Sequence, residues 1–224
     1  MLVNFFVSQK FSFGEHDEHG PKSGTIWILL KNRGWVVFLT SAFLGGIGAF
    51  SVAAYLAPYL QELGADGNQI GFALLLATFT EIPVFFFGNL LVKRFTAYGL
   101  FVISLALLGV RSLLLGAVDS LFLAIAVQGL GGAIFPALWS AGVAYADEHS
   151  PDGLKSTAQG LFGAMTFGFG SAVGGFIGGL LLASIGGRGM FLVFGIIILV
   201  GLALIEGIKR ILPEEKIPQS ASSD

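Results

Sequence analysis

Six windows of mostly apolar residues, each about 20 residues or longer, dominate this sequence and constrain its fold more than any other feature. A helix needs roughly 20 apolar residues to cross about 30 Å of hydrocarbon. Polar or turn-forming residues separate the windows, and each connection is short, so consecutive helices must run antiparallel. We therefore expect an all-α membrane protein with one six-helix bundle, its spans at residues 35–60, 69–92, 98–118, 121–144, 158–185 and 190–208.

The composition agrees with a lipid environment. Hydrophobic residues make up 54% of the chain and charged residues 12%, about half the charged share of a soluble domain. The net charge of −2 gives no indication of a nucleic acid partner. The chain has no cysteine, which excludes disulfides, thiolate metal sites and cysteine nucleophiles. The lipid bilayer is thus the first partner that the sequence predicts.

The distribution of lysine and arginine orients the bundle. Cationic loops stay in the cytoplasm, and consecutive spans force the loops to alternate between the two sides. Ten of the 12 cations fall on one side: Lys10, Lys22, Lys31, Arg33, Lys93, Arg94, Lys155, Lys209, Arg210 and Lys216. Arg188 lies on the other side and Arg111 lies within a span. We expect both termini in the cytoplasm.

Three regions follow from this interpretation: a cytoplasmic segment at residues 1–34, the transmembrane bundle at 35–210 and a polar cytoplasmic tail at 211–224. The first region has no basic stretch followed by a small-residue cleavage site, so we expect no signal peptide. It contains the run Glu15-His-Asp-Glu-His19, which lacks a scaffold and which we do not interpret as a metal site.

Nothing in the sequence predicts an enzyme, a cofactor or a metal. The three histidines lie outside the spans, the spans carry no paired carboxylates, and no phosphate-binding loop of ATP-driven pumps is present.

Two charged residues lie deep within predicted spans. Glu81 is near the centre of the second span and Arg111 is in the outer half of the third. An ionisable side chain at mid-bilayer costs about 2.5–3.5 kcal/mol, so such residues usually face a cavity or a partner. Side chains tilt toward the start of their own helix, which directs these two toward one another. We expect a Glu81–Arg111 pair, either direct or through water.

The pair has two interpretations at this point. It is either a structural clasp between adjacent helices, or a functional site in which Glu81 serves proton coupling or solute binding. In the second interpretation Arg111 adjusts how readily Glu81 binds a proton, or holds a solute carboxylate with its planar fork. Glu206 is different, because it lies near the end of the sixth span, and we expect an interfacial ion pair with Arg210.

Uncharged polar residues and prolines add weaker candidates. Gln128 and Gln159 face either a cavity or a neighbouring helix. Pro83 and Pro136 lie within spans, where proline weakens or kinks a helix, and Pro83 is close to Glu81. The fifth span is rich in glycine, and the spacing of Gly170, Gly174 and Gly178 predicts a face for close helix packing.

Taken together and in order, these residues resemble the C-terminal six-helix half of the major facilitator superfamily. Within it they are most similar to the phenylpropionate-permease-like branch. The resemblance covers about residues 25–212. Its motifs are Glu81-Ile-Pro83, the basic turn from Gly88 to Arg94, Val110-Arg111, Val127-Gln128 and Ala158-Gln159-Gly160.

The resemblance implies a secondary active transporter that works by alternating access. It implies proton-coupled uptake of a small organic solute such as an aromatic acid, in a plasma or inner membrane, with Glu81, Arg111 and Gln128 lining the cavity. A full member has about twelve spans, so we expect a second six-helix half, either a separate chain or another copy of this one. The alternative is a non-transporting membrane subunit or an inactive remnant of such a carrier.

Overall fold

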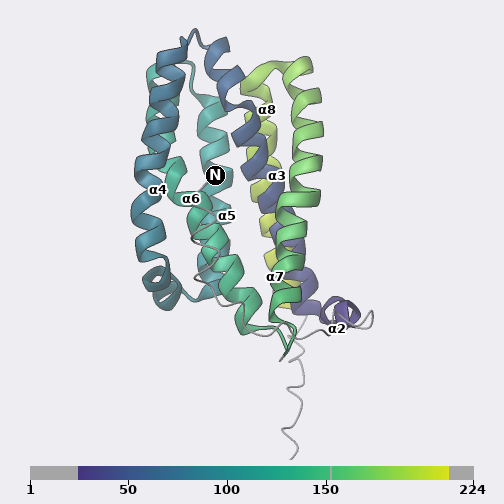
Figure 1. The fold of residues 1–224 in the computed structure, drawn as a ribbon. Helices are drawn as coiled ribbons and strands as arrows, with labels where there is room; N and C mark the ends of the chain where they lie inside the picture. The colour runs from purple at the N-terminus through teal and green to yellow at the C-terminus, as the bar shows by residue number, and fades with distance from the viewer. Residues whose placement is uncertain (1–24, 152, 212–224) are drawn as a thin grey trace, which may run out of the picture.

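The computed structural model describes residues 25–151 and 153–211, and every regular element in these ranges is a helix. Figure 1 shows long helices standing side by side in one bundle. In chain order they are α2 (Thr25–Lys31), α3 (Arg33–Glu62), α4 (Gly67–Phe95), α5 (Ala97–Ala117), α6 (Leu121–Glu148), α7 (Lys155–Gly163), the π-helix η1 (Ala164–Gly170) and α8 (Ser171–Ile211).

The predicted spans correspond closely to these helices. The first four are α3 to α6, each within a few residues of its predicted ends. The short helix α2 was not predicted and lies at the end of the bundle where α3 begins (Figure 1). The metal-like run at residues 15–19 and the tail at 212–224 lie outside the described residues.

Local hydrogen bonds explain where the helices begin. The side chain of Asn32 accepts the Trp35 amide at the start of α3. At the start of α4, Asp66 accepts the Gln69 amide at 2.8 Å while the Gln69 side chain accepts the Asp66 amide at 2.9 Å, forming a capping box. These bonds satisfy backbone N–H groups that have no partner inside a helix. They explain why α3 and α4 begin directly after Asn32 and Asp66.

The last helical stretch runs from Lys155 to Ile211, a length of 57 residues. At about 1.5 Å per residue it would measure roughly 85 Å if it were straight. It is not straight, because Gly186 has φ 71° and ψ 175°, which no helix contains. Positive φ is readily available only to glycine. The structure thus has a break at Gly186, between the predicted spans at 158–185 and 190–208.

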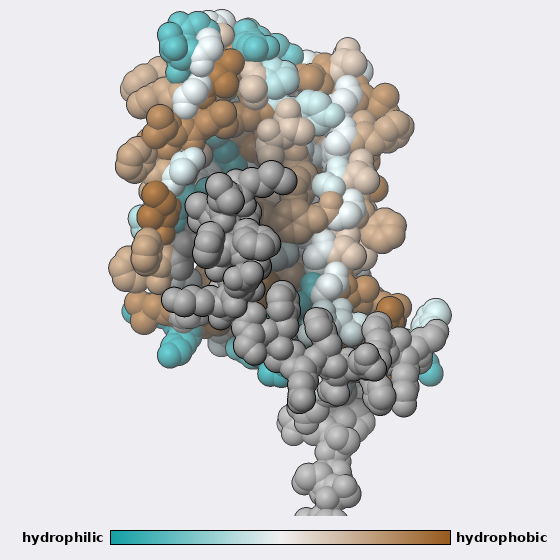
Figure 2. All heavy atoms as spheres, viewed as in Figure 1, coloured by the Kyte–Doolittle hydropathy of each residue, from teal (hydrophilic) through white to brown (hydrophobic). Residues whose placement is uncertain are grey.

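The apolar lengths suit a membrane. Four described helical stretches are long and apolar enough to cross one: Arg33–Glu62, Ala97–Ala117, Leu121–Glu148 and Lys155–Ile211. α4 bends by 41° between Gly67–Val84 and Phe86–Phe95, and it makes a fifth if both parts belong to one span. Large apolar side chains face outward, such as Phe86 at 81% and Phe122 at 77% exposure. Figure 2 shows this brown apolar cover over much of the visible surface.

The interior of the bundle has two apolar cores. One surrounds Trp35, Phe38 and Phe101, near the starts of α3 and α5, and the other surrounds Tyr59 and Phe191 near the opposite end of α3. Buried aromatic residues carry polar atoms that bond to backbone on other helices: Trp35 Nε1 donates to His149 O at 2.8 Å, and Tyr59 donates to Leu115 O in α5. These bonds hold neighbouring parts of the bundle together near both of its ends.

The predicted glycine face is confirmed. A Cβ at Gly170 would lie 2.8 Å from Gly46 Cα, and one at Gly174 would lie 2.6 Å from Ile47 O. A Cβ at Gly178 would overlap the ring of Tyr55. The glycines thus allow η1 and α8 to lie directly against the backbone of α3.

Candidate functional site

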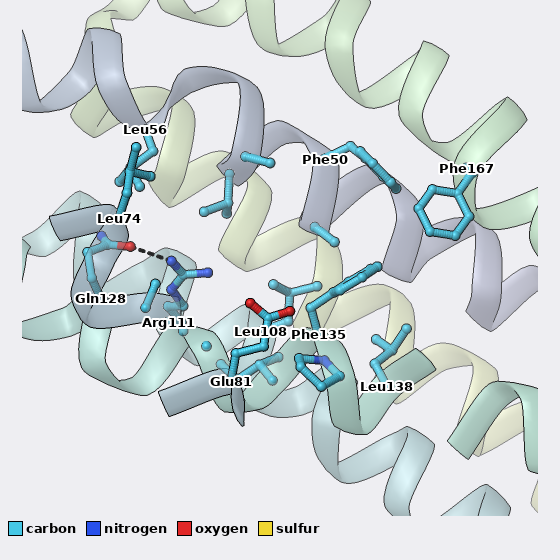
Figure 3. Close-up of a pocket in the computed structure, with 18 residues that line it drawn as sticks. Phe50, Leu56, Leu74, Glu81, Leu108, Arg111, Gln128, Phe135, Leu138 and Phe167 are labelled. Atoms are coloured by element: carbon cyan, nitrogen blue, oxygen red, sulfur yellow. Dashed lines mark hydrogen bonds between the residues drawn. The ribbon is translucent and has the colours of Figure 1, made fainter. Parts of the chain in front are cut away.

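A cavity of about 320 Å³ lies at mid-height in the bundle, between the two cores. Its walls come from α3, α4, α5, α6 and η1, and most of its lining is apolar or glycine. Three side chains supply the polar part of the wall, Glu81 from α4, Arg111 from α5 and Gln128 from α6. Figure 3 shows these three side chains reaching the same space from different helices. The volume is at the lower end of the range for small-molecule sites, about 300–1,000 Å³.

Arg111 is held by Gln128. Arg111 Nη2 donates to Gln128 Oε1 at 2.5 Å, and Gln128 Nε2 donates to Ala124 O at 3.3 Å. Gln128 is fully buried, so its amide is fixed by these two bonds. Arg111 Nε is also buried, and it has no hydrogen-bond partner. An unpartnered buried donor costs about 1–3 kcal/mol, so the site retains a buried, unused donor on the one cation in its lining.

Glu81 has a different environment. It is half-buried, and its carboxylate points into the cavity (Figure 3). Among the described residues it forms no hydrogen bond and no ion pair, since the one ion pair there joins Lys155 to Asp147. The predicted direct Glu81–Arg111 pair is therefore wrong. The two residues share one cavity, but the Arg111 guanidinium is turned toward Gln128 instead.

Aromatic rings form another wall of the cavity. Phe50 from α3, Phe135 from α6 and Phe167 from η1 line it together. Phe50 and Phe167 have ring centroids 5.1 Å apart, and Trp139 supports Phe167 from behind at 4.7 Å, both in edge-on geometry. Figure 3 shows this group of rings across the space from Gln128 and Arg111. The cavity thus has a cationic region and an aromatic region, with the Glu81 carboxylate also facing it.

The remaining candidate residues fall in different places. Pro136 lines the cavity within a continuous α6. Pro83 is exposed on α4, close to the 41° bend that follows Val84. Gln159 is half-buried in α7 and does not line the cavity.

The predicted Glu206–Arg210 ion pair is wrong, because Glu206 accepts a hydrogen bond from the Tyr98 hydroxyl of α5. Within the described ranges no three His, Asp or Glu side chains are grouped to hold a metal ion.

Sequence reasoning missed the aromatic wall and two glycines in the lining of the cavity. Phenylalanines occur throughout the chain, and their facing direction depends on how each helix is rotated, which no local pattern specified. Phe167 lies on a π-helix, whose wider turn changes the rotation of everything that follows. Gly131 and Gly132 stand next to each other in α6 and line the cavity. An adjacent glycine pair inside an apolar span was the available signal.

Comparison with known proteins gives a consistent result. A sequence model of the MFS_1 like family matches residues 1–193. The chain is 24% identical over 213 residues to the Major facilitator superfamily domain-containing protein 6-like of Mus musculus, covering 94% of this chain and 36% of that protein. It is 23% identical over 187 residues to protein B of that name from Xenopus laevis, covering 82% and 30%.

A bacterial relative is also similar. The Uncharacterized transporter YwbF of Bacillus subtilis is 23% identical over 176 residues, covering 79% of this chain and 44% of that protein. The chain therefore spans less than half the length of each of these curated relatives.

Proposed function

Because the chain belongs to the MFS_1 like family, we propose that it forms one half of a secondary active transporter for a small organic solute. One observation carries this proposal: a cavity within a bundle of membrane-type helices holds a carboxylate and a guanidinium that form no direct ion pair with each other. Charges this deep in an apolar bundle are costly and usually mark a solute or ion pathway.

The proposed topology has six spans with both termini in the cytoplasm. Five come from α3 to α6 and from the stretch before Gly186, and the sixth from the part of α8 after it. Two features support this count: the non-helical Gly186, and a 57-residue stretch that is too long for one crossing. The sorting of cations to one side supports the orientation. On this proposal residues 1–34 and 211–224 are cytoplasmic.

We propose that Arg111 binds the solute through a carboxylate. Nε and Nη2 form one edge of the guanidinium, and this edge can donate two parallel bonds to a carboxylate. In the structure Gln128 occupies Nη2 only, and Nε has no partner. A solute carboxylate that replaced Gln128 would engage both donors. Its apolar body would then lie against Phe50, Phe135 and Phe167, which favours an aromatic acid.

Glu81 is proposed as the proton site. An ionised Glu81 repels a solute carboxylate in the same cavity, and protonation removes the repulsion. Proton and anion therefore bind cooperatively, and each raises the affinity for the other by the same factor. This coupling is what a proton-driven symporter needs.

A second six-helix half is proposed to complete the carrier, either as a separate chain or as another copy of this one. The length of the curated relatives supports this, because the chain spans less than half of each of them. Alternating access would then arise as the two halves rock about the cavity in a plasma or inner membrane.

The test is uptake into proteoliposomes that contain the chain alone and with candidate second halves. Benzoate is the probe solute, and an inward proton gradient is imposed. We expect gradient-driven accumulation for the wild type and none for Glu81→Gln, which cannot release a proton. Glu81→Gln should still insert normally and still exchange benzoate across the membrane.

Two outcomes would contradict the proposal in different ways. Equal gradient-driven uptake by the wild type and Glu81→Gln would remove Glu81 from the coupling mechanism. Uptake of nothing by any combination, with the chain correctly inserted, would favour the alternative of a non-transporting membrane subunit.

A further inference from the structure

Gly131 lies directly against the guanidinium of Arg111. A Cβ at position 131 would be 2.6 Å from Arg111 Nε and still closer to Cζ and Nη2. Cβ atoms are essentially never found so close to another heavy atom. Any side chain at this position would therefore displace the guanidinium or move α6.

The neighbouring glycine has a different role. A Cβ at Gly132 would overlap the Ala77 carbonyl oxygen and the Thr80 hydroxyl of α4. Gly132 is thus a packing glycine that lets two helix backbones approach, as Gly174 does for α8 and α3. Gly131 meets a charged side chain instead of a backbone, so close packing of helices does not explain it.

The position of Gly131 relative to Gln128 relates its contact with Arg111 to the candidate site. The two residues are three apart in α6, so they lie on the same face of the helix, one turn apart. Gln128 accepts a hydrogen bond from Nη2, and the space that a Cβ would occupy at Gly131 is filled by Cζ, Nη2 and Nε of the same guanidinium. The missing side chain at Gly131 leaves a notch in the surface of α6. Arg111 belongs to α5, and its side chain lies across this notch where it lines the cavity.

We propose that Gly131 is a positioning residue, which admits the Arg111 guanidinium to the cavity wall so that its Nε–Nη2 edge can bind a carboxylate that displaces Gln128. The inference rests on the proposed function for the role of Arg111. The notch at Gly131 does not, because it follows from the geometry of the two helices alone. The proposal predicts that a methyl group at position 131 weakens solute binding only by displacing Arg111. This loss should vanish when the guanidinium is removed.

The experiment compares Gly131→Ala with Gly129→Ala in the full chain in lipid nanodiscs. Gly129 is a matched control on the same helix, because a Cβ there would be 3.9 Å from its nearest neighbour, Leu76. The first readout is the NMR signal of Arg111 Nε–H, assigned by its loss in Arg111→Lys. We expect Gly131→Ala to move this signal and Gly129→Ala to leave it in place.

The second readout is benzoate affinity, arranged as a double-mutant cycle. Gly131→Ala should weaken benzoate binding by about tenfold in the wild-type background, as expected for residues in direct contact. It should cause no further loss when Arg111 is already alanine. A further loss of similar size in that background would overturn the proposal, and so would an unchanged Arg111 signal in Gly131→Ala.

Two other outcomes are also decisive. If Gly131→Ala does not fold, adding Arg111→Ala should restore insertion and helicity, and failure to restore them would overturn the notch. If the wild type binds no benzoate but the Arg111 signal moves as expected, the notch is supported and the proposed solute class is contradicted.

Discussion

Arg111 shows what the sequence could and could not predict at the scale of one residue. Its depth in the bilayer, and that of Glu81, followed from counting residues along each span. Their partners did not follow, because a hydrogen bond depends on the rotation of a helix about its axis. The guanidinium is turned toward Gln128, and the direct pair with Glu81 does not form. Both charged residues and Gln128 nevertheless line one cavity.

Replacing Gln128 with glutamate tests the idea that a carboxylate takes the guanidinium edge. The side chain of Gln128→Glu has the same length, and its carboxylate can form a charge-assisted pair with Arg111. It would compete with a solute for the same donors, so benzoate affinity should fall by about tenfold or more, since such pairs are worth about 1.5–3 kcal/mol. Calorimetric titration of the reconstituted chain measures this.

Gln159→Glu provides the matched control, because Gln159 lies in α7 away from the cavity. It should leave benzoate affinity unchanged. Equal losses in both variants would show that an added negative charge acts at long range and that Gln128 has no special position.

At the scale of elements, glycine spacing was a better guide than hydrophobic length. The lengths predicted where helices begin and end, and Gly186 with positive φ marked the break inside the long final stretch. The spacing of Gly170, Gly174 and Gly178 predicted which face of that stretch meets another helix. The π-helix η1 was not predictable, because its sequence Ala164–Gly170 has no feature that separates it from an α-helix.

Two adjacent glycines in α8 allow a direct test of the packing face. Gly174→Ala would push a methyl group into the Ile47 carbonyl and the Ser51 hydroxyl of α3, and we expect it to destabilise the fold by about 1–3 kcal/mol. Gly175→Ala meets nothing within 4 Å, and its better helix propensity should stabilise by up to about 1 kcal/mol. Thermal unfolding in detergent compares the two. A larger loss for Gly175→Ala than for Gly174→Ala would contradict the close contact between α8 and α3.

At the scale of the whole molecule, the two apolar cores hold the bundle together and the cavity between them carries the candidate functional residues. Hydrogen bonds from Trp35 and Tyr59 fix the two ends of the bundle, and the charged and aromatic walls occupy its middle. The all-helical class and the membrane-spanning character were predictable from apolar length. The aromatic and glycine parts of the cavity wall were not, because the wall is formed by residues from five elements that are far apart in sequence.

The central claim is that this mid-bundle cavity is a solute pathway, which requires it to hold water within the membrane, and reaction of a single cysteine tests this most directly. The chain has no cysteine, so an introduced thiol is the only one. Ala53→Cys lines the cavity, nine residues before the end of α3 at Glu62. Leu107→Cys lies at similar depth, ten residues before the end of α5 at Ala117, and its side chain faces outward.

A small charged methanethiosulfonate reagent reacts with thiolates, which form only in contact with water. For the reconstituted chain the account predicts that Ala53→Cys is modified about tenfold or more faster than Leu107→Cys. Equally slow modification of both would show that the cavity is dry, and would contradict its role as a solute pathway.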